Sequence, residues 1–177
     1  MTTIAYKDGV IAGDTMVWEG QTATGHAAKV GRLPDGSLWG FAGMSKDLSR
    51  LKPWLLCPIG NPVEIDKESS LMIVLTDGRV MFYEENGFLE TKAPFHAFGS
   101  GSDIAMGAMW AGATAQLAVA AAIDMNAYTA GDVMSFALGK EPEVGPVEEE
   151  FTDEELAIPP IEEAAPVSES WRKVLGL

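Results

Sequence analysis

The chain has 177 residues, of which 47% are hydrophobic, so it is long enough to bury one sizeable core. Its net charge of −14 excludes the basic surface that phosphate contacts require, and we expect no nucleic-acid partner. Much of the negative charge lies in residues 141–177, which hold 11 of the 26 acids and 2 of the 12 bases.

The sequence also predicts a protein that is neither inserted in a membrane nor secreted. It has no apolar run of about 18 residues, the length that a membrane-spanning helix needs, and no charged-then-apolar signal segment opens the chain. Its one cysteine, Cys57, cannot form an internal disulfide and fits a reducing compartment. We therefore expect a cytoplasmic location and no membrane partner.

Tight turns divide the first half of the chain. Asp-Gly pairs, which are typical of β-hairpins, stand between β-favouring runs at positions 8–9, 35–36 and 77–78. The predicted hairpins pair Thr3–Tyr6 with Val10–Ala12, Ala28–Leu33 with Ser37–Ala42, and Leu71–Thr76 with Arg79–Tyr83. A fourth hairpin is predicted between Phe88–Lys92 and His96–Gly99, across Ala93-Pro94.

A first helix is predicted after the second hairpin. It spans Ser45–Leu56, begins near Ser45 or Asp47, and is limited by Pro53 and Pro58.

Two more helices are predicted after the fourth hairpin. The first spans Ser102–Ala111, with Ser102 as its N-cap and Gly112 as its stop. Thr114 can cap the second, which spans Ala115–Asp124. Both segments are rich in alanine and glycine, which suits close packing against a sheet.

Hairpins followed by layered helices indicate an α+β sandwich over residues 1–139. A last extended piece, Asn126–Leu138, is expected to return to the sheet. Residues 140–167 are rich in proline and glutamate and cannot bury enough apolar area to fold, so they predict a flexible acidic linker. Residues 168–177, with Trp171 and Leu175, are either an amphipathic segment that docks on a partner or a frayed end.

Catalytic chemistry is suggested by the second residue. A small residue after Met1 is what the methionine-removing machinery accepts, and its removal leaves Thr2 with a hydroxyl and a free α-amine. Such a residue is a nucleophile that carries its own general base, because an α-amine titrates near neutral pH. Many chains that begin Met-Thr are not enzymes, so this feature needs support from elsewhere.

That support comes from polar or glycine-rich groups at predicted strand ends. They are Ile11–Asp14, Lys29, Gly40–Gly43 and Gly99–Ser102. In this order, together with Thr2–Ile4, the run Lys29–Leu33 and Asp124–Thr129, they resemble the motifs of the proteasome β-subunit family, most closely those of the bacterial HslV-type peptidases. The resemblance covers residues 2–138.

The resemblance implies an N-terminal-nucleophile hydrolase with a four-layer αββα sandwich. It also implies threonine-type hydrolysis of peptides or unfolded proteins, a homo-oligomeric ring, and a bacterial or virus-infected bacterial cell.

Catalytic roles for five residues follow from the resemblance, position by position. Thr2 is the nucleophile and its amine is the base, while Lys29 favours the neutral amine and polarises the hydroxyl. Asp14 holds Lys29 in place, and the amide of Gly43 binds the oxyanion. Ser100 supports the amine and hydroxyl of Thr2. Ordinary structural alternatives are an ion pair for Asp14 and Lys29, a turn glycine for Gly43, and a cap hydroxyl for Ser100.

The resemblance also implies supporting residues and a substrate pocket. Asp124 and Thr129 match the family's acid and hydroxyl near the lysine. Val17, Ala27 and Gly40 are expected to line an apolar pocket for the residue before the scissile bond.

No cofactor and no metal are predicted. His26 and His96 have no acid or cysteine partner at metal-ligand spacing. A structural cation bound by backbone carbonyls between residues 124 and 129 stays open, since some family members hold one there.

One segment departs from the family. Family members have two long helices between the Gly-Phe-Ala-Gly turn and the next hairpin, whereas here only Met44–Ser70 fills that gap. Those helices help to pack rings together, so a stacked double ring and an unfolding ATPase are not implied. Two other functions remain open, namely a non-catalytic assembly protein on the same fold and a hydrolase of small amides.

Overall fold

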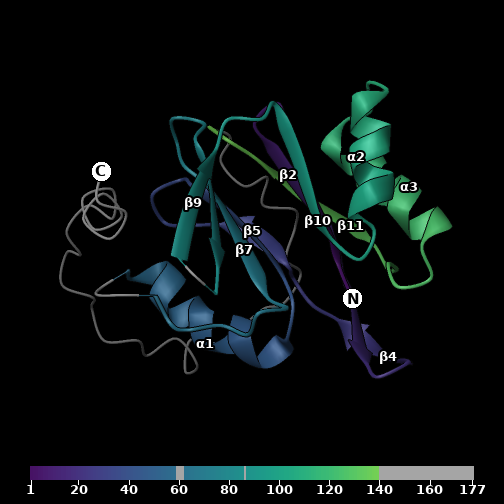
Figure 1. Ribbon diagram of the computed structural model, residues 1–177, viewed down its shortest axis with the longest axis horizontal. Helices are drawn as coiled ribbons and strands as arrows, with labels where there is room; N and C mark the ends of the chain where they lie inside the picture. The colour runs from purple at the N-terminus through teal and green to yellow at the C-terminus, as the bar shows by residue number, and fades with distance from the viewer. Residues whose placement is uncertain (59–61, 86, 140–177) are drawn as a thin grey trace, which may run out of the picture.

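The computed structural model describes residues 1–58, 62–85 and 87–139. Most of its strands form two antiparallel sheets (Figure 1). The four-stranded sheet has the order β10 (Phe95–Gly99), β1 (Thr3–Lys7), β2 (Val10–Asp14) and β11 (Val133–Ala137). The five-stranded sheet has the order β5 (Val30–Arg32), β6 (Leu38–Ala42), β7 (Ser70–Val74), β8 (Val80–Glu84) and β9 (Gly87–Thr91).

Helices cover the outer faces of the two sheets (Figure 1). Helix α1 (Ser45–Leu56) packs on the five-stranded sheet. Helices α2 (Ser102–Trp110) and α3 (Ala115–Met125) pack on each other and on the four-stranded sheet. The predicted linker, residues 140–167, and the C-terminal segment, residues 168–177, lie outside the described residues.

Alternation of side chains along the strands explains this layering. In β6, Trp39 points into the core shared with α1, whereas Leu38 points into the core between the sheets. In β1, Ile4 points into the core between the sheets, and Ala5 faces α2 and α3. The layers therefore succeed one another as helix, sheet, sheet and helix, and the predicted α+β class is confirmed.

The hairpins predicted at the three Asp-Gly turns are present as β1–β2, β5–β6 and β7–β8. The fourth predicted hairpin is wrong, because β9 pairs with β8 while β10 pairs with β1. Pro94 lies between these strands and has no N–H to give to a ladder. The chain crosses there from one sheet to the other, and a hydrogen bond of 2.5 Å between Thr91 Oγ1 and His96 Nε2 spans the crossing.

A fifth hairpin, β3 (Met16–Glu19) with β4 (Thr22–His26), was not predicted. It forms a two-stranded sheet outside the two large ones. All five residues of β4 are exposed, so this strand has no buried face and its sequence shows no apolar alternation. Gly20, with φ of +60°, makes the turn without an Asp-Gly pair.

Helix α1 has the predicted bounds, but Pro53 does not limit the helix as expected. Pro53 lies inside the last turn, where the loss of one backbone hydrogen bond is tolerated. Gly101, not Ser102, occupies the N-cap position of α2.

The predicted cap of α3 is confirmed, whereas the last predicted strand is shorter than expected. Thr114 caps α3 as predicted, accepting a hydrogen bond of 3.3 Å from the Leu117 amide. The predicted extended piece, Asn126–Leu138, is a strand only over Val133–Ala137 and pairs with β2. No helix in the described ranges is long and apolar enough to cross a membrane.

Candidate active site

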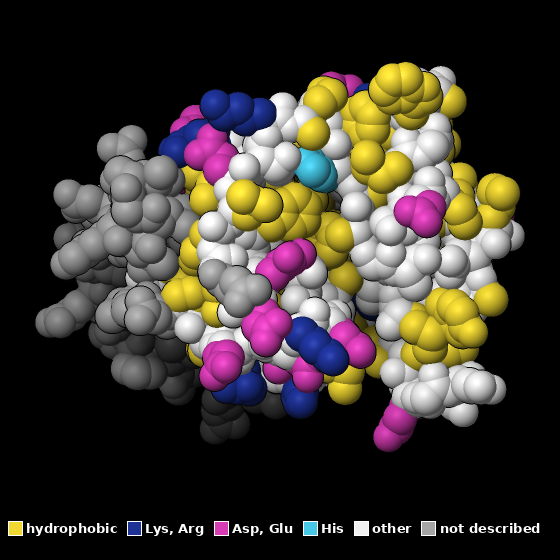
Figure 2. Space-filling view, viewed as in Figure 1, with side chains coloured by type: hydrophobic (Ala, Val, Ile, Leu, Met, Phe, Trp, Pro, Cys, Tyr) yellow, Lys and Arg dark blue, Asp and Glu magenta, His cyan; other side chains and the backbone are white. Residues whose placement is uncertain are grey.

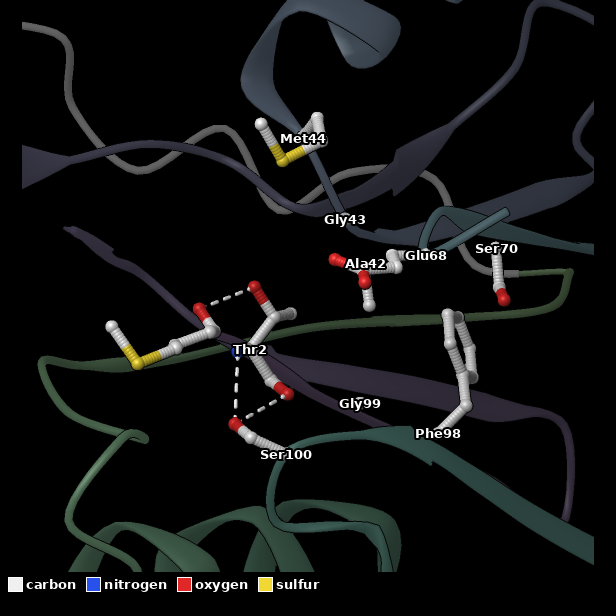
Figure 3. A pocket seen from close by; sticks show the side chains of 10 residues that line it. Thr2, Ala42, Gly43, Met44, Glu68, Ser70, Phe98, Gly99 and Ser100 are labelled. Carbon is white, nitrogen blue, oxygen red and sulfur yellow. Dashed lines mark hydrogen bonds between the residues drawn. The ribbon is translucent and has the colours of Figure 1, made fainter. Parts of the chain in front are cut away.

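Thr2 directly precedes β1, and Ser100 forms hydrogen bonds with both the backbone nitrogen and the backbone oxygen of Thr2. The Thr2 amide donates to Ser100 Oγ at 3.1 Å (Figure 3). The Thr2 carbonyl accepts from the Ser100 amide at 2.7 Å and from Ser100 Oγ at 3.2 Å. Gly99 allows this close approach, since it has φ of +94° and a Cβ there would lie 2.1 Å from the Thr2 oxygen. The structure thus brings Thr2 and Ser100 together.

Lys29 and Asp14 form a buried ion pair next to Thr2. Lys29 Nζ lies 2.9 Å from Asp14 Oδ2, and the side chains are 8% and 0% exposed. The other carboxylate oxygen of Asp14 accepts from the Thr3 amide at 2.7 Å. Burial lowers the pKa of Lys29 from its ordinary value, and the hydrogen bond and charge of Asp14 oppose that shift. Asp14 therefore connects the lysine to the backbone of β1.

The carbonyl oxygen of Met1 is a shared acceptor at this site. It accepts from Thr2 Oγ1 at 2.6 Å and from Lys29 Nζ at 3.2 Å. The α-amine of Met1 has a pKa below its ordinary value, first because burial disfavours the charged form and second because Lys29 repels it, while Asp14 acts in the opposite sense. The hydroxyl and the ammonium thus converge on one point.

Two cavities meet at Thr2. One, of about 360 Å³, lies between Thr2 and Phe98 and contains Glu68 and Ser100 (Figure 3). The other, of about 250 Å³, lies between β3 and α1. Met1, Thr2 and Gly43 line both cavities.

Gly43 occupies a position that no other residue could take without movement. Its φ is +145°, and a Cβ would come within 2.3 Å of Ser69 Oγ. Ser69 Oγ in turn accepts from the Met44 amide at 3.1 Å and donates to the buried Asp47 at 2.8 Å. The turn after β6 is thereby held next to Thr2.

No protein-family model matches the chain, and no curated protein matches it. Solved structures do match. Thiobacillus denitrificans BPH superposes with a TM-score of 0.60 and 22% identity, over 80% of this chain and 99% of that chain. BPH from the same organism in complex with epoxomicin gives 0.59 and 22%, over 78% and 99%. Eukaryotic HslV from Trypanosoma brucei gives 0.56 and 20%, over 77% and 98%.

The chain has the proteasome-like fold of HslV. The fold predicted from its motifs is thereby confirmed. In this HslV-like fold, the first strand of the chain begins directly after Thr2, and the turn after β6 lies beside Thr2.

The predicted substrate pocket of this HslV-like fold is only partly as expected. Val17 and Ala27 line the smaller cavity. Gly40 does not belong to it, because a Cβ on Gly40 would meet Ile4 and Ile11 in the core between the sheets. Leu38 and Ala42 face the same core, and side chains two apart in a strand share a face.

Besides Thr2 and Lys29, the smaller cavity has three polar residues that come from α1 and were missed. Ser45, Ser49 and Lys52 line it together with the apolar Leu48. Their spacing of four and three residues is the one signal that could have placed them on a single helix face.

The two predicted supporting residues differ in their contacts. Thr129 is 2% exposed, and its hydroxyl lies 2.7 Å from that of Thr3, which also accepts from the Gly101 amide at 3.0 Å. Asp124 is exposed on α3, and among the described residues it has no hydrogen bond or ion pair with Thr2 or Lys29. Thr129 therefore supports β1, and Asp124 lies apart from the site.

The site offers no cluster of side chains for a metal ion among the residues that the structure describes. Within the described ranges, no group of three or more His, Cys, Asp or Glu side chains could hold a metal ion. A cation held by backbone carbonyls between residues 124 and 129 stays a prediction.

Proposed function

We propose that the chain is a threonine-type peptide hydrolase in which Thr2 is the nucleophile once Met1 is removed. The observation that carries this proposal is the shared oxygen of Met1, on which Thr2 Oγ1 and Lys29 Nζ converge. Removal of Met1 takes away that acceptor and turns the Thr2 amide into a free amine. The hydroxyl, the amine and the ammonium then stand around a space where a substrate carbonyl can enter.

The amine of Thr2 is the proposed general base. In its neutral form it accepts the proton of the hydroxyl as the oxygen attacks the carbonyl carbon of the substrate. The charge of Lys29 favours the neutral amine and stabilises the developing alkoxide. Ser100 Oγ lies 3.1 Å from the Thr2 nitrogen and orients it.

The attack forms a tetrahedral intermediate whose oxyanion faces the Gly43 amide, because Gly43 and Thr2 line the same cavities. The carbon–nitrogen bond then breaks, the leaving amine takes the proton from the Thr2 amine, and an ester on Thr2 remains. A water molecule, deprotonated by the same amine, hydrolyses the ester and restores the hydroxyl.

The proposed substrates are peptides or unfolded proteins. The proposed assembly is a homo-oligomeric ring. Figure 2 shows hydrophobic side chains gathered over α2 and α3. Trp110, Leu117 and Met125 are 83%, 61% and 73% exposed there. A second copy of the chain would cover such a surface. Light scattering at several concentrations measures the mass of the particle and so whether the chain assembles.

Labelling of the purified protein tests the proposal. Intact mass should show the loss of one Met residue, and epoxomicin, the ligand in the BPH complex, should form an adduct on Thr2. Thr2→Ala should abolish both the adduct and peptide cleavage, whereas Thr22→Ala, on the exposed strand β4, should change neither.

Other outcomes distinguish the alternatives. An intact Met1 with no adduct would support a non-catalytic assembly protein. An adduct on Thr2 with cleavage of small amides but of no peptide would support a small-amide hydrolase.

A further inference from the structure

The smaller cavity beside Thr2 carries a positive charge that nothing in its wall balances. Its lining includes Lys29 and Lys52 and no carboxylate. Lys29 is already paired with Asp14. Lys52 is exposed, and among the described residues no carboxylate lies within ion-pair distance of it.

Helix α1 presents its polar groups to this cavity from one face. Ser45, Ser49 and Lys52 are spaced by four and three residues, which places them along one ridge of the helix. The Ser49 hydroxyl donates to the Ser45 carbonyl at 3.1 Å, so it is already engaged within the helix. The groups left to donate to a ligand are the Ser45 hydroxyl and the Lys52 ammonium.

The rest of the cavity is apolar. Val17, Ala27, Phe41 and Leu48 line it, and its volume of about 250 Å³ suits one side chain rather than a whole ligand. The cavity on the other side of Thr2 contains Glu68 in place of a lysine. The two sides of Thr2 therefore differ in the sign of their charge.

Resting on the proposed function, we propose that the smaller cavity selects a glutamate side chain before the scissile bond and that Lys52 determines this specificity. The methylene groups of the glutamate contact Val17 and Leu48, and its carboxylate pairs with Lys52 at the rim. Because the rim is exposed to water, the carboxylate keeps part of its hydration, and the pairing avoids the desolvation cost of a buried ion pair.

Peptides that differ in one residue test this inference. Short fluorogenic peptides carry Glu, Gln, Leu or Arg before the scissile bond, and kcat/KM is measured for each. The wild type should prefer Glu over Leu and Arg, with Gln in between. Lys52→Glu should lower the ratio of Glu to Arg cleavage by about tenfold or more, since it replaces attraction by repulsion.

A charge reversal outside the cavity serves as the matched control. Lys46→Glu makes the same change on the same helix, but Lys46 lines neither cavity, so the ratio should change less than about twofold. Raising the ionic strength should reduce the preference of the wild type and leave that of Lys52→Ala unchanged.

Failure of the inference is separate from failure of the proposed function. If an epoxyketone labels Thr2 but Leu is the preferred residue, or if Lys52→Glu keeps the wild-type ratio, the inference is overturned and the function stands. Labelling rates of epoxyketones with Glu or Leu at this position give the same comparison without turnover. If no probe labels Thr2 and no peptide is cleaved, the function fails and the inference with it.

Discussion

The hydroxyl of Thr2 and the ammonium of Lys29 donate hydrogen bonds to one and the same oxygen, that of the Met1 carbonyl. A hydroxyl and a fixed cation are thus already arranged around a peptide carbonyl while Met1 is in place.

Replacing Lys29 by methionine should affect both activity and stability. Cleavage should fall by about 10²-fold or more, because the amine and the developing alkoxide lose their cation. The free energy of unfolding should fall by about 3–5 kcal/mol, because Asp14 is left buried and unpaired. Urea denaturation and peptide cleavage measure the two effects. Adding Asp14→Asn should restore much of the stability and none of the activity, and a return of activity would contradict the role of Lys29.

Replacing Ser100 by alanine should slow cleavage by about tenfold to hundredfold, because the Thr2 nitrogen loses the hydroxyl that orients it. The loss of stability should be only about 1 kcal/mol. The control is Ser102→Ala, at the first residue of α2, which should leave cleavage near the wild-type rate. Equal effects of the two variants would show that Ser100 is merely a turn residue.

Replacing Gly43 by alanine should lower cleavage by about 10²–10³-fold, as expected for the loss of an oxyanion donor. The added Cβ would lie 2.3 Å from Ser69 Oγ and would displace the turn. Thermal unfolding of the same variant shows how far the displacement spreads. Alanine at Gly78, an open turn with no atom within 4 Å, separates the backbone strain of a positive φ from the effect at the site.

The pH dependence of cleavage should follow the protonation of the Thr2 amine, the proposed general base. Burial and, second, the charge of Lys29 lower the pKa of the Met1 α-amine. The Thr2 amine exposed by removal of Met1 lies beside the same lysine, so we expect its pKa to be lowered too and the neutral base to be present at lower pH than for an ordinary amine. The rate should rise with pH through that pKa, and the rise should lie at lower pH than for an ordinary α-amine. In Lys29→Met the rising limb should move to higher pH, and an unmoved limb in kcat/KM profiles would assign the limb to another group.

The stability of the fold should depend on His96. Burial lowers the pKa of His96 below its ordinary value, so the unfolded chain binds the proton more readily than the folded one. The free energy of unfolding should therefore decrease as the pH falls through the ordinary histidine pKa, and it should be constant above that. His96→Gln should flatten this dependence, whereas His26→Gln, on the exposed strand β4, should keep it.

Local signals predicted most of the fold. The Asp-Gly turns predicted three hairpins because a tight turn fixes the pairing of its own strands. The fourth hairpin failed because β9 and β10 complete different sheets, a choice made by partners distant in sequence. The exposed β3–β4 hairpin has no buried face, and so it gave no pattern to detect.

The site was predictable where backbone contacts hold it. Thr2, Asp14, Lys29, Gly43 and Ser100 lie together, as their motifs implied, whereas their catalytic roles stay predictions. Val17 and Ala27 of the cavity wall were predicted, whereas Lys52 was not, because it reaches the cavity only through the packing of α1. The assignment of Gly40 to the pocket was wrong, because the sequence did not show which face of β6 each residue occupies. Leu38 and Ala42, two positions away on either side, face the core between the sheets, and Gly40 faces it too.

The β3–β4 hairpin has a further consequence. Val17 and Trp18 belong to β3, and they form a wall of the smaller cavity, yet the hairpin contributes no strand to either large sheet. Grafting a different loop between positions 18 and 25 should therefore retune which peptides are accepted while the scaffold around the nucleophile keeps its rigidity. Selectivity and catalysis could then diversify independently of each other.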